Sequence, residues 1–249
     1  MPILVTPRLK ISQPRLSVQR RNFKDLKPHL NKIKIAKKGI QRDTFSAVYN
    51  GKPVIIKVWY DPAILHYLAK EVRILAKLQK FPFIARLIEV GKDYFIQENV
   101  GGQTLIEYLN GTRASRLDPV KVLSTLASAA SMESLIQKEG FSHNDLHPGN
   151  IVMTPAGVVI IDFGIAVEKA VDPENFRGAM VQDLFDLMVL SYIGIDSIKP
   201  PLASELISTN RRYAANVFDI NEDTIGRYGR DLLSIVVTLR RWQRRRGSM

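Results

Sequence analysis

The sequence has 249 residues, 45% of them hydrophobic, and contains no cysteine. This length and apolar content suffice for one sizeable core or for two closely joined lobes. The absence of cysteine excludes disulfides, thiolate metal sites and cysteine nucleophiles. No stretch approaches the roughly 18 uninterrupted apolar residues of a membrane helix, and the N-terminus lacks the order of a secretory signal. We therefore expect a soluble chain with no signal peptide or transmembrane segment.

The net charge is +12, and the basic residues gather in two places. One cluster lies in the first forty residues, and the other closes the chain as Arg240, Arg241, Arg244, Arg245 and Arg246. A basic surface concentrates anions, so these clusters favour an acidic protein, a nucleic acid or an anionic membrane surface as a partner. Solvated faces and a frayed basic tail are the alternative. The oligomeric state cannot be read from the sequence.

The start of the chain is rich in Pro, Ser, Thr and Arg without a sustained helical or alternating period, which is typical of a flexible basic leader over residues 1–30. Short β-type runs follow over residues 33–36, 44–49 and 53–60. Asn50-Gly51 separates the last two runs, and this dipeptide is a strong hairpin signal. The sequence therefore predicts a hairpin directly after the first strand.

Asp61-Pro62 provides a helix cap with proline at the first helical position, and apolar residues then recur at helical spacing up to Leu78. Two more strands are expected over residues 84–91 and 93–100, before Gly101-Gly102 breaks the pattern. These elements predict a small β-rich lobe that ends near Val100.

Beyond residue 100 the pattern is mostly helical. A long helix is expected from Asp118-Pro119 to about Glu139, two short strands over residues 150–154 and 158–162, and mostly helix from about Met180. The sequence thus predicts a larger second lobe.

The most informative stretch is SHNDLHPGNIVMTPAGVVIIDFG, residues 142–164. His143, Asp145 and Asn150 stand in the spacing HxDxxxxN, and Asp162-Phe163-Gly164 ends the apolar run. Transfer of the ATP γ-phosphate needs an acceptor for the proton of the substrate hydroxyl and oxygen ligands for Mg²⁺. Asp145 suits the first task, and Asn150 and Asp162 suit the second.

This pattern resembles the catalytic and metal-binding loops of the protein-kinase superfamily, and the resemblance covers about residues 33 to 195. It implies an α+β, two-lobed protein-kinase-like fold. Its N-lobe, residues 31–100, would hold a small antiparallel β-sheet with one helix, and its C-lobe, residues 101–249, would be truncated, mostly helical and closed by the basic tail. The resemblance also implies ATP and Mg²⁺ as cofactors.

Lys57 looks like the strand lysine that holds the α- and β-phosphates, and Glu71 looks like its helix partner. A carboxylate on the buried face of a helix is costly unless it is paired, which favours this pair. Asp145, Lys57 and Glu71 are therefore the expected catalytic residues. Asp183 resembles the buried aspartate that anchors the catalytic loop, with Asp186 as a competitor.

The phosphate loop departs from the family pattern. Gln41, Asp43 and Ser46 stand where three glycines are usual, and only Phe45 and Val48 match. Glycine lets the backbone approach the phosphates, so the amides of this loop would bind them less or differently.

The segment Glu98-Asn99-Val100 is similar to the kinase hinge that binds adenine, with Gln97 at the gatekeeper position. The resemblance implies that Asn150 and Asp162 are the magnesium ligands. The full set of expected nucleotide-binding residues is Phe45, Ser46, Val48, Lys57, Gln97, Glu98, Val100, Asn150 and Asp162.

Asn144 replaces the arginine that usually precedes the catalytic aspartate, and residues 165–190 contain no Ser, Thr or Tyr. Activation by phosphorylation of this segment works by pairing a phosphate with arginine, and here both partners are missing. We therefore expect activity without such phosphorylation.

The chain as a whole resembles the atypical, minimal Ser/Thr protein kinases that bacteria inject into host cells as effectors, which implies a protein substrate and a cytoplasmic or injected location. The run LHPGN, which contains His147, is instead similar to aminoglycoside phosphotransferases and lipid-directed kinases, so a small-molecule or lipid kinase is the alternative. The irregular phosphate loop and the basic clusters leave a third interpretation, a kinase-fold scaffold that binds an acidic partner or RNA without catalysis.

Overall fold

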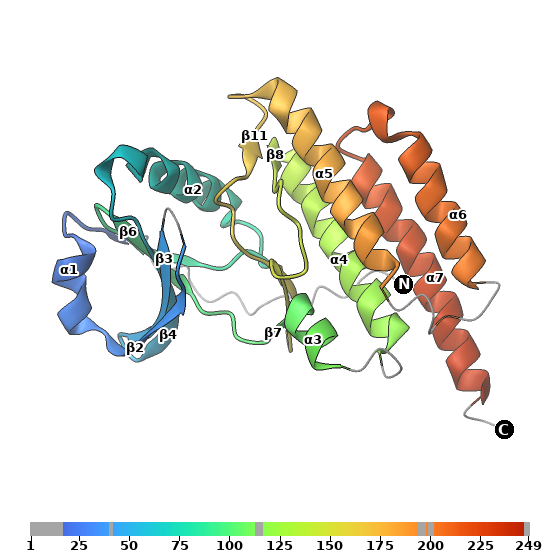
Figure 1. The fold of residues 1–249 in the computed structure, drawn as a ribbon, viewed down its shortest axis with the longest axis horizontal. Helices are drawn as coiled ribbons and strands as arrows, with labels where there is room; N and C mark the ends of the chain where they lie inside the picture. The colour runs from blue at the N-terminus through green and yellow to red at the C-terminus, as the bar shows by residue number, and fades with distance from the viewer. Residues whose placement is uncertain (1–16, 40–41, 113–116, 194–197, 199–201, 247–249) are drawn as a thin grey trace. The chain divides into compact units, whose positions relative to one another are not determined.

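The computed structural model describes residues 17–39, 42–112, 117–193, 198 and 202–246 (Figure 1). The chain divides into two compact units, with the boundary between Gly101 and Gly102, which we call the first and the second unit. The first is built on a β-sheet and the second mostly on helices. This confirms the α+β, kinase-like fold class that the sequence predicts.

A six-stranded sheet forms the first unit, with strands in the order β1-β5-β6-β4-β3-β2. β1 (Ser17–Val18) pairs with β5 (Leu87–Val90) in parallel. The sequence predicts an antiparallel sheet, and this one pair departs from that prediction. The other pairs are antiparallel and join β6 (Tyr94–Glu98), β4 (Lys52–Val58), β3 (Asp43–Tyr49) and β2 (Asn31–Lys37).

The hairpin between β3 and β4 turns at Asn50-Gly51, as predicted. Both residues have positive φ, 50° and 74°, which is the backbone of the two-residue turns that match the strand twist. The predicted helix is also present. Asp61 caps a short 3₁₀ turn (Pro62–Ile64) by accepting from the backbone N–H of Ala63 at 2.8 Å, and α2 (Leu65–Leu78) follows.

Residues 17–30 are the largest departure from the sequence prediction. They form β1, α1 (Phe23–Leu26) and a 3₁₀ turn (Lys27–His29). Phe23, Leu26 and Leu30 are buried in the core of the first unit, and the Phe23 ring stacks on Phe45 at 5.1 Å. The prediction of a flexible leader is therefore wrong for these residues, because their few apolar side chains cover one face of the sheet. Residues 1–16 lie outside the described residues.

A buried carboxylate fixes this segment to the sheet. The side chain of Glu89 on β5 is only 4% exposed, and it accepts hydrogen bonds from Arg21 at 2.9 Å, Tyr49 at 2.8 Å and Tyr94 at 2.5 Å. Burial alone would raise the pKa of Glu89, but the hydrogen bonds from Tyr94, Arg21 and Tyr49 outweigh it and lower the pKa. Three separate segments of the first unit thus meet on one charge.

Helices α4 (Pro119–Lys138), α5 (Pro173–Ser191), α6 (Leu202–Ala215) and α7 (Thr224–Arg246) pack together in the second unit (Figure 1). The predicted helix from Asp118-Pro119 corresponds to α4. Gly229 of α7 permits its close approach to α4, because a Cβ there would lie 2.9 Å from Cβ of Ala130 and 3.0 Å from the carbonyl oxygen of Ala127.

Shorter elements complete this unit. They are α3 (Leu105–Gly111), the 3₁₀ turn Val217–Asp219, the sheet of β7 (Gln103–Thr104), β9 (Ile151–Thr154) and β10 (Gly157–Ile160), and the pair β8 (Phe141–Ser142) with β11 (Val167–Glu168). The predicted strand pair around Pro155-Ala156-Gly157 is present. No helix in the described parts of the chain is long and apolar enough to cross a membrane.

Replacement of Glu89 by Gln is expected to lower the free energy of unfolding by about 1–3 kcal/mol at pH 7, because three donors lose a charged acceptor. The pKa of Glu89 is lower folded than unfolded, so its stabilisation is present above the ordinary value of 4.5 and is lost as the pH falls through the folded pKa. Urea unfolding monitored by the buried Trp59 should show the gap between wild type and Glu89→Gln closing at acidic pH. The exposed Glu205→Gln is the matched control, and equal stabilities of wild type and Glu89→Gln at pH 7 would contradict the assignment.

Candidate active site

Lys57 and Glu71 form a buried ion pair in the first unit. The Nζ of Lys57, on β4, lies 2.5 Å from Oε1 of Glu71, on α2, and the two side chains are only 4% and 1% exposed. Glu71 also accepts through Oε2 from Arg42 at 3.0 Å. The expected pair is present, and Arg42 is a second cation on the same carboxylate that the sequence analysis missed. Arg42 lies just before β3 and belongs to no motif, so only the structure reveals it.

The strand register shows which predicted nucleotide residues share a face of the sheet. Ser46 pairs with Ile55 and Val48 with Pro53 across β3 and β4, while Gln97 of β6 pairs with Ile55. Since side chains alternate along a strand and directly paired residues point the same way, Ser46, Val48 and Gln97 lie on the face that carries Lys57.

Phe45 lies on the opposite face, so its predicted role as a nucleotide contact requires a correction. The side chain is 8% exposed and packs in the core with Phe23 and Leu26. The sequence pattern places Phe45 at a position of the family's phosphate loop. It does not show that the N-terminal segment packs against this ring in the core.

Gln97, Glu98 and Val100 lie where the chain leaves the first unit. The side chain of Gln97 is buried, and the backbone N–H of Glu98 donates to the carbonyl of Arg86 at 2.8 Å. The next residues, Gly101 and Gly102, have φ of 64° and 89°. At Gly102 a Cβ would meet the carbonyl oxygen of Met153 at 2.3 Å, so only glycine fits there.

Asp183 on α5 anchors the segment of the second unit that the sequence predicts to be the catalytic loop. Its Oδ2 accepts from the hydroxyl of Ser142 at 2.6 Å and from the backbone N–H of Asn144 at 3.0 Å. Its competitor Asp186 instead accepts from Gln182 at 2.7 Å on its own helix. Asn144 has φ 62°, a backbone region that asparagine adopts more readily than arginine, which explains the departure at this position.

Asp145 and Asn150 contact each other directly. The Nδ2 of Asn150 donates to the backbone oxygen of Asp145 at 2.9 Å and to its Oδ2 at 3.1 Å. Both bonds use the nitrogen of the amide, so the amide oxygen, the atom suited to a hard cation, is directed elsewhere. The side chain of Asp145 is 40% exposed. It is therefore accessible to an acceptor hydroxyl.

His147 lies beside Asp145. Its Nδ1 accepts from the backbone N–H of Gly149 at 2.9 Å, which assigns the proton of the neutral ring to Nε2. That Nε2 lies 3.7 Å from Oδ2 of Asp145. The LHPGN turn thus presents an imidazole N–H next to the carboxylate.

Asp162 follows the strand β10 with φ 66°. His143 holds the preceding residue, because its Nε2 donates to the carbonyl of Ile161 at 2.9 Å, and its ring meets Phe163 edge-on at 4.7 Å. The backbone N–H of Ile161 donates to the carbonyl of Asn150 at 3.0 Å. The two loops that carry Asn150 and Asp162 are therefore tied together.

The donor set fits magnesium. Asn150 and Asp162 offer an amide and a carboxylate oxygen, and no group of three or more His, Cys, Asp or Glu suited to a metal occurs among the described residues. Magnesium in nucleotide enzymes takes one or two protein oxygens and completes its shell with phosphates and water. These two residues would hold such an ion.

The segment after Asp162 is short, since α5 starts already at Pro173 rather than near Met180 as expected. Asp172 caps the helix by accepting from the backbone N–H of Asn175 at 3.1 Å. Between Asp162 and α5, the strand β11 pairs with β8, which leads into the predicted catalytic loop. The pattern Asp172-Pro173 is a helix-start signal that the sequence analysis did not use.

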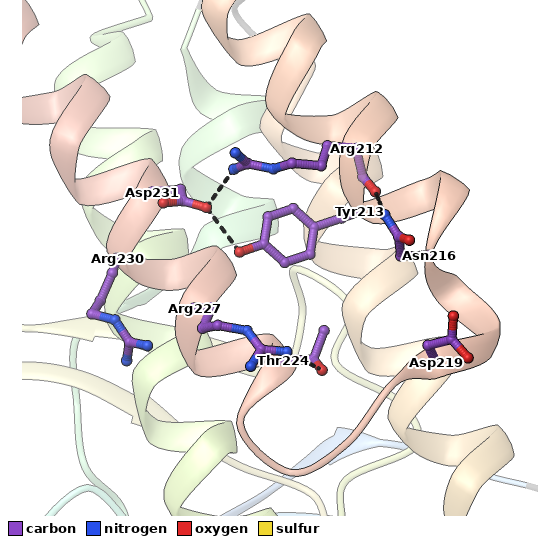
Figure 2. Close-up of a pocket in the computed structure, with 8 residues that line it drawn as sticks. All are labelled: Arg212, Tyr213, Asn216, Asp219, Thr224, Arg227, Arg230 and Asp231. Carbon is purple, nitrogen blue, oxygen red and sulfur yellow. Dashed lines mark hydrogen bonds and ion pairs between the residues drawn. The ribbon is translucent and has the colours of Figure 1, made fainter.

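A pocket of about 600 Å³ lies between α6 and α7 (Figure 2). Arg212 and the hydroxyl of Tyr213 both donate to Oδ2 of Asp231, at 2.7 and 2.8 Å, and Arg227 donates to Thr224 at 3.1 Å. Burial and the hydrogen bond to Asp231 raise the pKa of Tyr213 to about 12. No residue that the sequence predicts for catalysis or nucleotide binding lines this pocket, so it is separate from the candidate active site.

Comparison with known proteins supports the kinase assignment. The family model of the ABC1 atypical kinase-like domain matches residues 90–192, which include the catalytic loop and Asp162. The chain is 34% identical over 190 residues to the serine/threonine-protein kinase PknA of Mycobacterium tuberculosis, covering 62% of this chain and 43% of that protein. The chain is thus similar to protein kinases over its central part, and these matches support an atypical kinase of the protein-kinase-like superfamily.

Two further relatives are also similar to this chain. A probable serine/threonine-protein kinase of Streptomyces coelicolor is 30% identical over 175 residues, covering 58% of this chain and 25% of the relative. One of Dictyostelium discoideum is 30% identical over 169 residues, covering 57% and 33%. The chain thus spans less than half the length of the relatives it matches.

Replacement of Glu71 by Ala is expected to lower the free energy of unfolding by about 3–5 kcal/mol, because it leaves the ammonium of Lys57 buried without its partner. The double variant Lys57→Met with Glu71→Leu should recover most of this loss, since well-packed apolar residues replace a buried pair at little cost and the partly exposed Arg42 can reach water. Urea unfolding measures both, and a double variant as unstable as Glu71→Ala would contradict the ion-pair argument.

Proposed function

We propose that the chain is an ATP- and magnesium-dependent phosphotransferase, an atypical protein kinase that transfers the γ-phosphate to Ser or Thr hydroxyls. The observation that carries the proposal is the catalytic loop, in which Asp145 and Asn150 contact each other and Asp183 anchors the residues before them. The serine/threonine kinases among the relatives support the choice of acceptor.

In this proposal Asp145 orients the acceptor hydroxyl and accepts its proton as the phosphate is transferred. The exposure of its carboxylate suits this role, and Asn150 fixes the orientation of the carboxylate. Asn150 and Asp162 would hold magnesium, which when bound would neutralise part of the phosphate charge. Lys57, oriented by Glu71, binds the α- and β-phosphates.

The remaining contacts to the nucleotide come from the first unit. Ser46, Val48 and Gln97 lie on the Lys57 face of the sheet, and backbone groups of Glu98 and Val100 bind adenine as in a kinase hinge. Because the phosphate loop lacks the usual glycines, side-chain donors such as Ser46 take a larger share of phosphate binding here.

A small-molecule or lipid acceptor is the second candidate, and His147 is the observation that favours it. Its Nε2–H beside Asp145 is an imidazole donor, whereas protein kinases usually place a lysine at this position. A donor of this kind suits a compact hydroxylic acceptor as well as a protein side chain.

The basic β2 strand and the arginines near the C-terminus would recruit an acidic protein, a nucleic acid or an anionic membrane, in the cytoplasm or in a host cell.

Substitution of Asp145 by Ala should lower transfer of labelled γ-phosphate from Mg-ATP by at least about 100-fold, because the general base is lost. Autophosphorylation and a generic protein acceptor are monitored in parallel with sugar, aminoglycoside and lipid acceptors. Glu174→Gln, an exposed carboxylate at the start of α5, is the control that keeps wild-type transfer. Transfer by wild type to a small molecule alone would replace the protein acceptor by the second candidate, and no transfer to any acceptor would favour the scaffold.

Activity should not require phosphorylation of the segment after Asp162. The segment from residue 165 to 190 offers no Ser, Thr or Tyr, and Asn144 replaces the arginine that would pair with a phosphate. Phosphatase-treated and untreated protein are therefore expected to show equal transfer rates. A phosphate mapped to this segment by mass spectrometry that raises the rate would refute this expectation.

A further inference from the structure

Glu133 is a buried carboxyl group beneath the catalytic loop that the kinase mechanism does not use. It lies on α4 with no exposed surface. Its Oε1 accepts from the backbone N–H of His143 and from Nε2 of Gln137, both at 3.2 Å. Its Oε2 has no hydrogen-bond partner among the described residues. A charged carboxylate oxygen that is buried without a hydrogen-bond partner is costly, and protonation of the carboxyl group removes this cost.

Asp183 shows the complementary pattern from α5. It is also fully buried, and its Oδ2 is occupied by Ser142 and Asn144, while Oδ1 has no partner within the described part of the chain. The carboxyl groups of Glu133 and Asp183 accept hydrogen bonds from three successive residues of one loop, so they are close neighbours, and each acts on the titration of the other. Two neighbouring buried carboxylates are costly when both are charged, but one proton shared between them would satisfy both open oxygens.

We propose that Glu133 is a positioning residue that stays protonated and donates a hydrogen bond to Asp183, so that this acid–carboxylate pair holds three successive residues of the catalytic loop. Asp183 binds Ser142 and Asn144, and Glu133 binds the N–H of His143 between them. Asp145 is the next residue. The effect of this pair on catalysis rests on the proposed function, whereas its effect on stability does not.

The electrostatics of the pair agree with this assignment of the proton. Burial first, and then the charge of Asp183, raise the pKa of Glu133 well above its ordinary value of 4.5. Burial also raises the pKa of Asp183, but His143, Ser142 and Asn144 oppose it, so Asp183 is the member that keeps its charge. The titratable groups that act on the pair are thus its two members and His143, with Asp186 one turn further along α5.

The pair implies that function and stability are lost as the pH rises. Since the pKa of Glu133 is higher in the folded chain than in the unfolded chain, its stabilisation is present below pH 4.5 and is lost as the pH rises through the raised folded value. Loss of the proton puts a second negative charge beside Asp183, so the two carboxylates repel each other and the anchor that they form under the loop is disturbed. The turnover rate should fall more than nucleotide affinity, because the loop carries the proton acceptor.

Glu133→Gln tests the proposal, because the amide is always neutral, can donate from Nε2 to Asp183 and can still accept from His143. Thermal unfolding of the full chain across pH 6 to 10 is compared for wild type, Glu133→Gln, Glu133→Leu and the control Glu139→Gln, an exposed carboxylate at the end of the same helix. Relative to wild type, the unfolding midpoint of Glu133→Gln should rise as the pH increases, while the control should follow wild type. A pH dependence of Glu133→Gln identical to that of wild type would overturn the proton-sharing pair, whether or not the chain has kinase activity.

The pH profile of kcat tests the positioning role. The fall in wild-type kcat with rising pH that the pair implies should be absent in Glu133→Gln, and Glu133→Leu should lose roughly tenfold or more in kcat at all pH values with the KM for ATP nearly unchanged. A normal kcat in Glu133→Leu would overturn the positioning role. If wild type transfers no phosphate, the proposed function fails, and the unfolding comparison still decides whether the pair shares a proton.

Discussion

Buried carboxyl groups that must find partners are the constraint on which this structure depends. A charge removed from water is tolerated only where hydrogen bonds or opposite charges replace the lost hydration. Asp183 meets this requirement by binding the loop that contains Ser142 and Asn144, and in doing so it fixes the backbone immediately before Asp145. The hydrogen bonds that anchor the predicted catalytic loop are therefore also what allows α5 to bury the charge of Asp183.

The first unit uses the same principle twice, on opposite faces of one sheet. Glu71 binds Lys57 and Arg42 on the face of the predicted nucleotide residues. Glu89 binds Arg21, Tyr49 and Tyr94 and thereby secures the N-terminal segment that covers the other face. Glu71 thus couples α2 to β4, and Glu89 couples the N-terminal segment to β5. Loss of one partner leaves the rest of the group buried and uncompensated.

Much of the fold and of the candidate site follows from sequence, because those parts are encoded by local signals. The turn Asn50-Gly51, the cap Asp61-Pro62 and the spacing of His143, Asp145 and Asn150 each depend on residues close together in the chain. The pair of Lys57 and Glu71 could be predicted because a carboxylate on an apolar helix face requires a cation. The contacts of Arg21 with Glu89 and of Arg42 with Glu71 could not, since each joins residues distant in sequence and belongs to no repeating pattern.

The error over residues 17–30 has a similar origin. Composition identified the segment as polar and irregular, and three apolar side chains are too few to signal a helix. They are nevertheless enough to complete a core whose other side chains come from strands far along the chain. The position of Phe45 depends on this same segment, which is why its predicted contact with nucleotide was wrong.

Calorimetric titration of ATP, with and without magnesium, into wild type, Lys57→Met and Asp162→Asn tests most directly the proposal that the chain binds Mg-ATP and that each of these residues contributes. We expect magnesium-dependent binding by wild type and a loss of about tenfold or more in affinity in each variant, because each removes a charged contact to the phosphates or the metal. Wild-type affinity in both variants, or no binding of Mg-ATP by wild type, would contradict it.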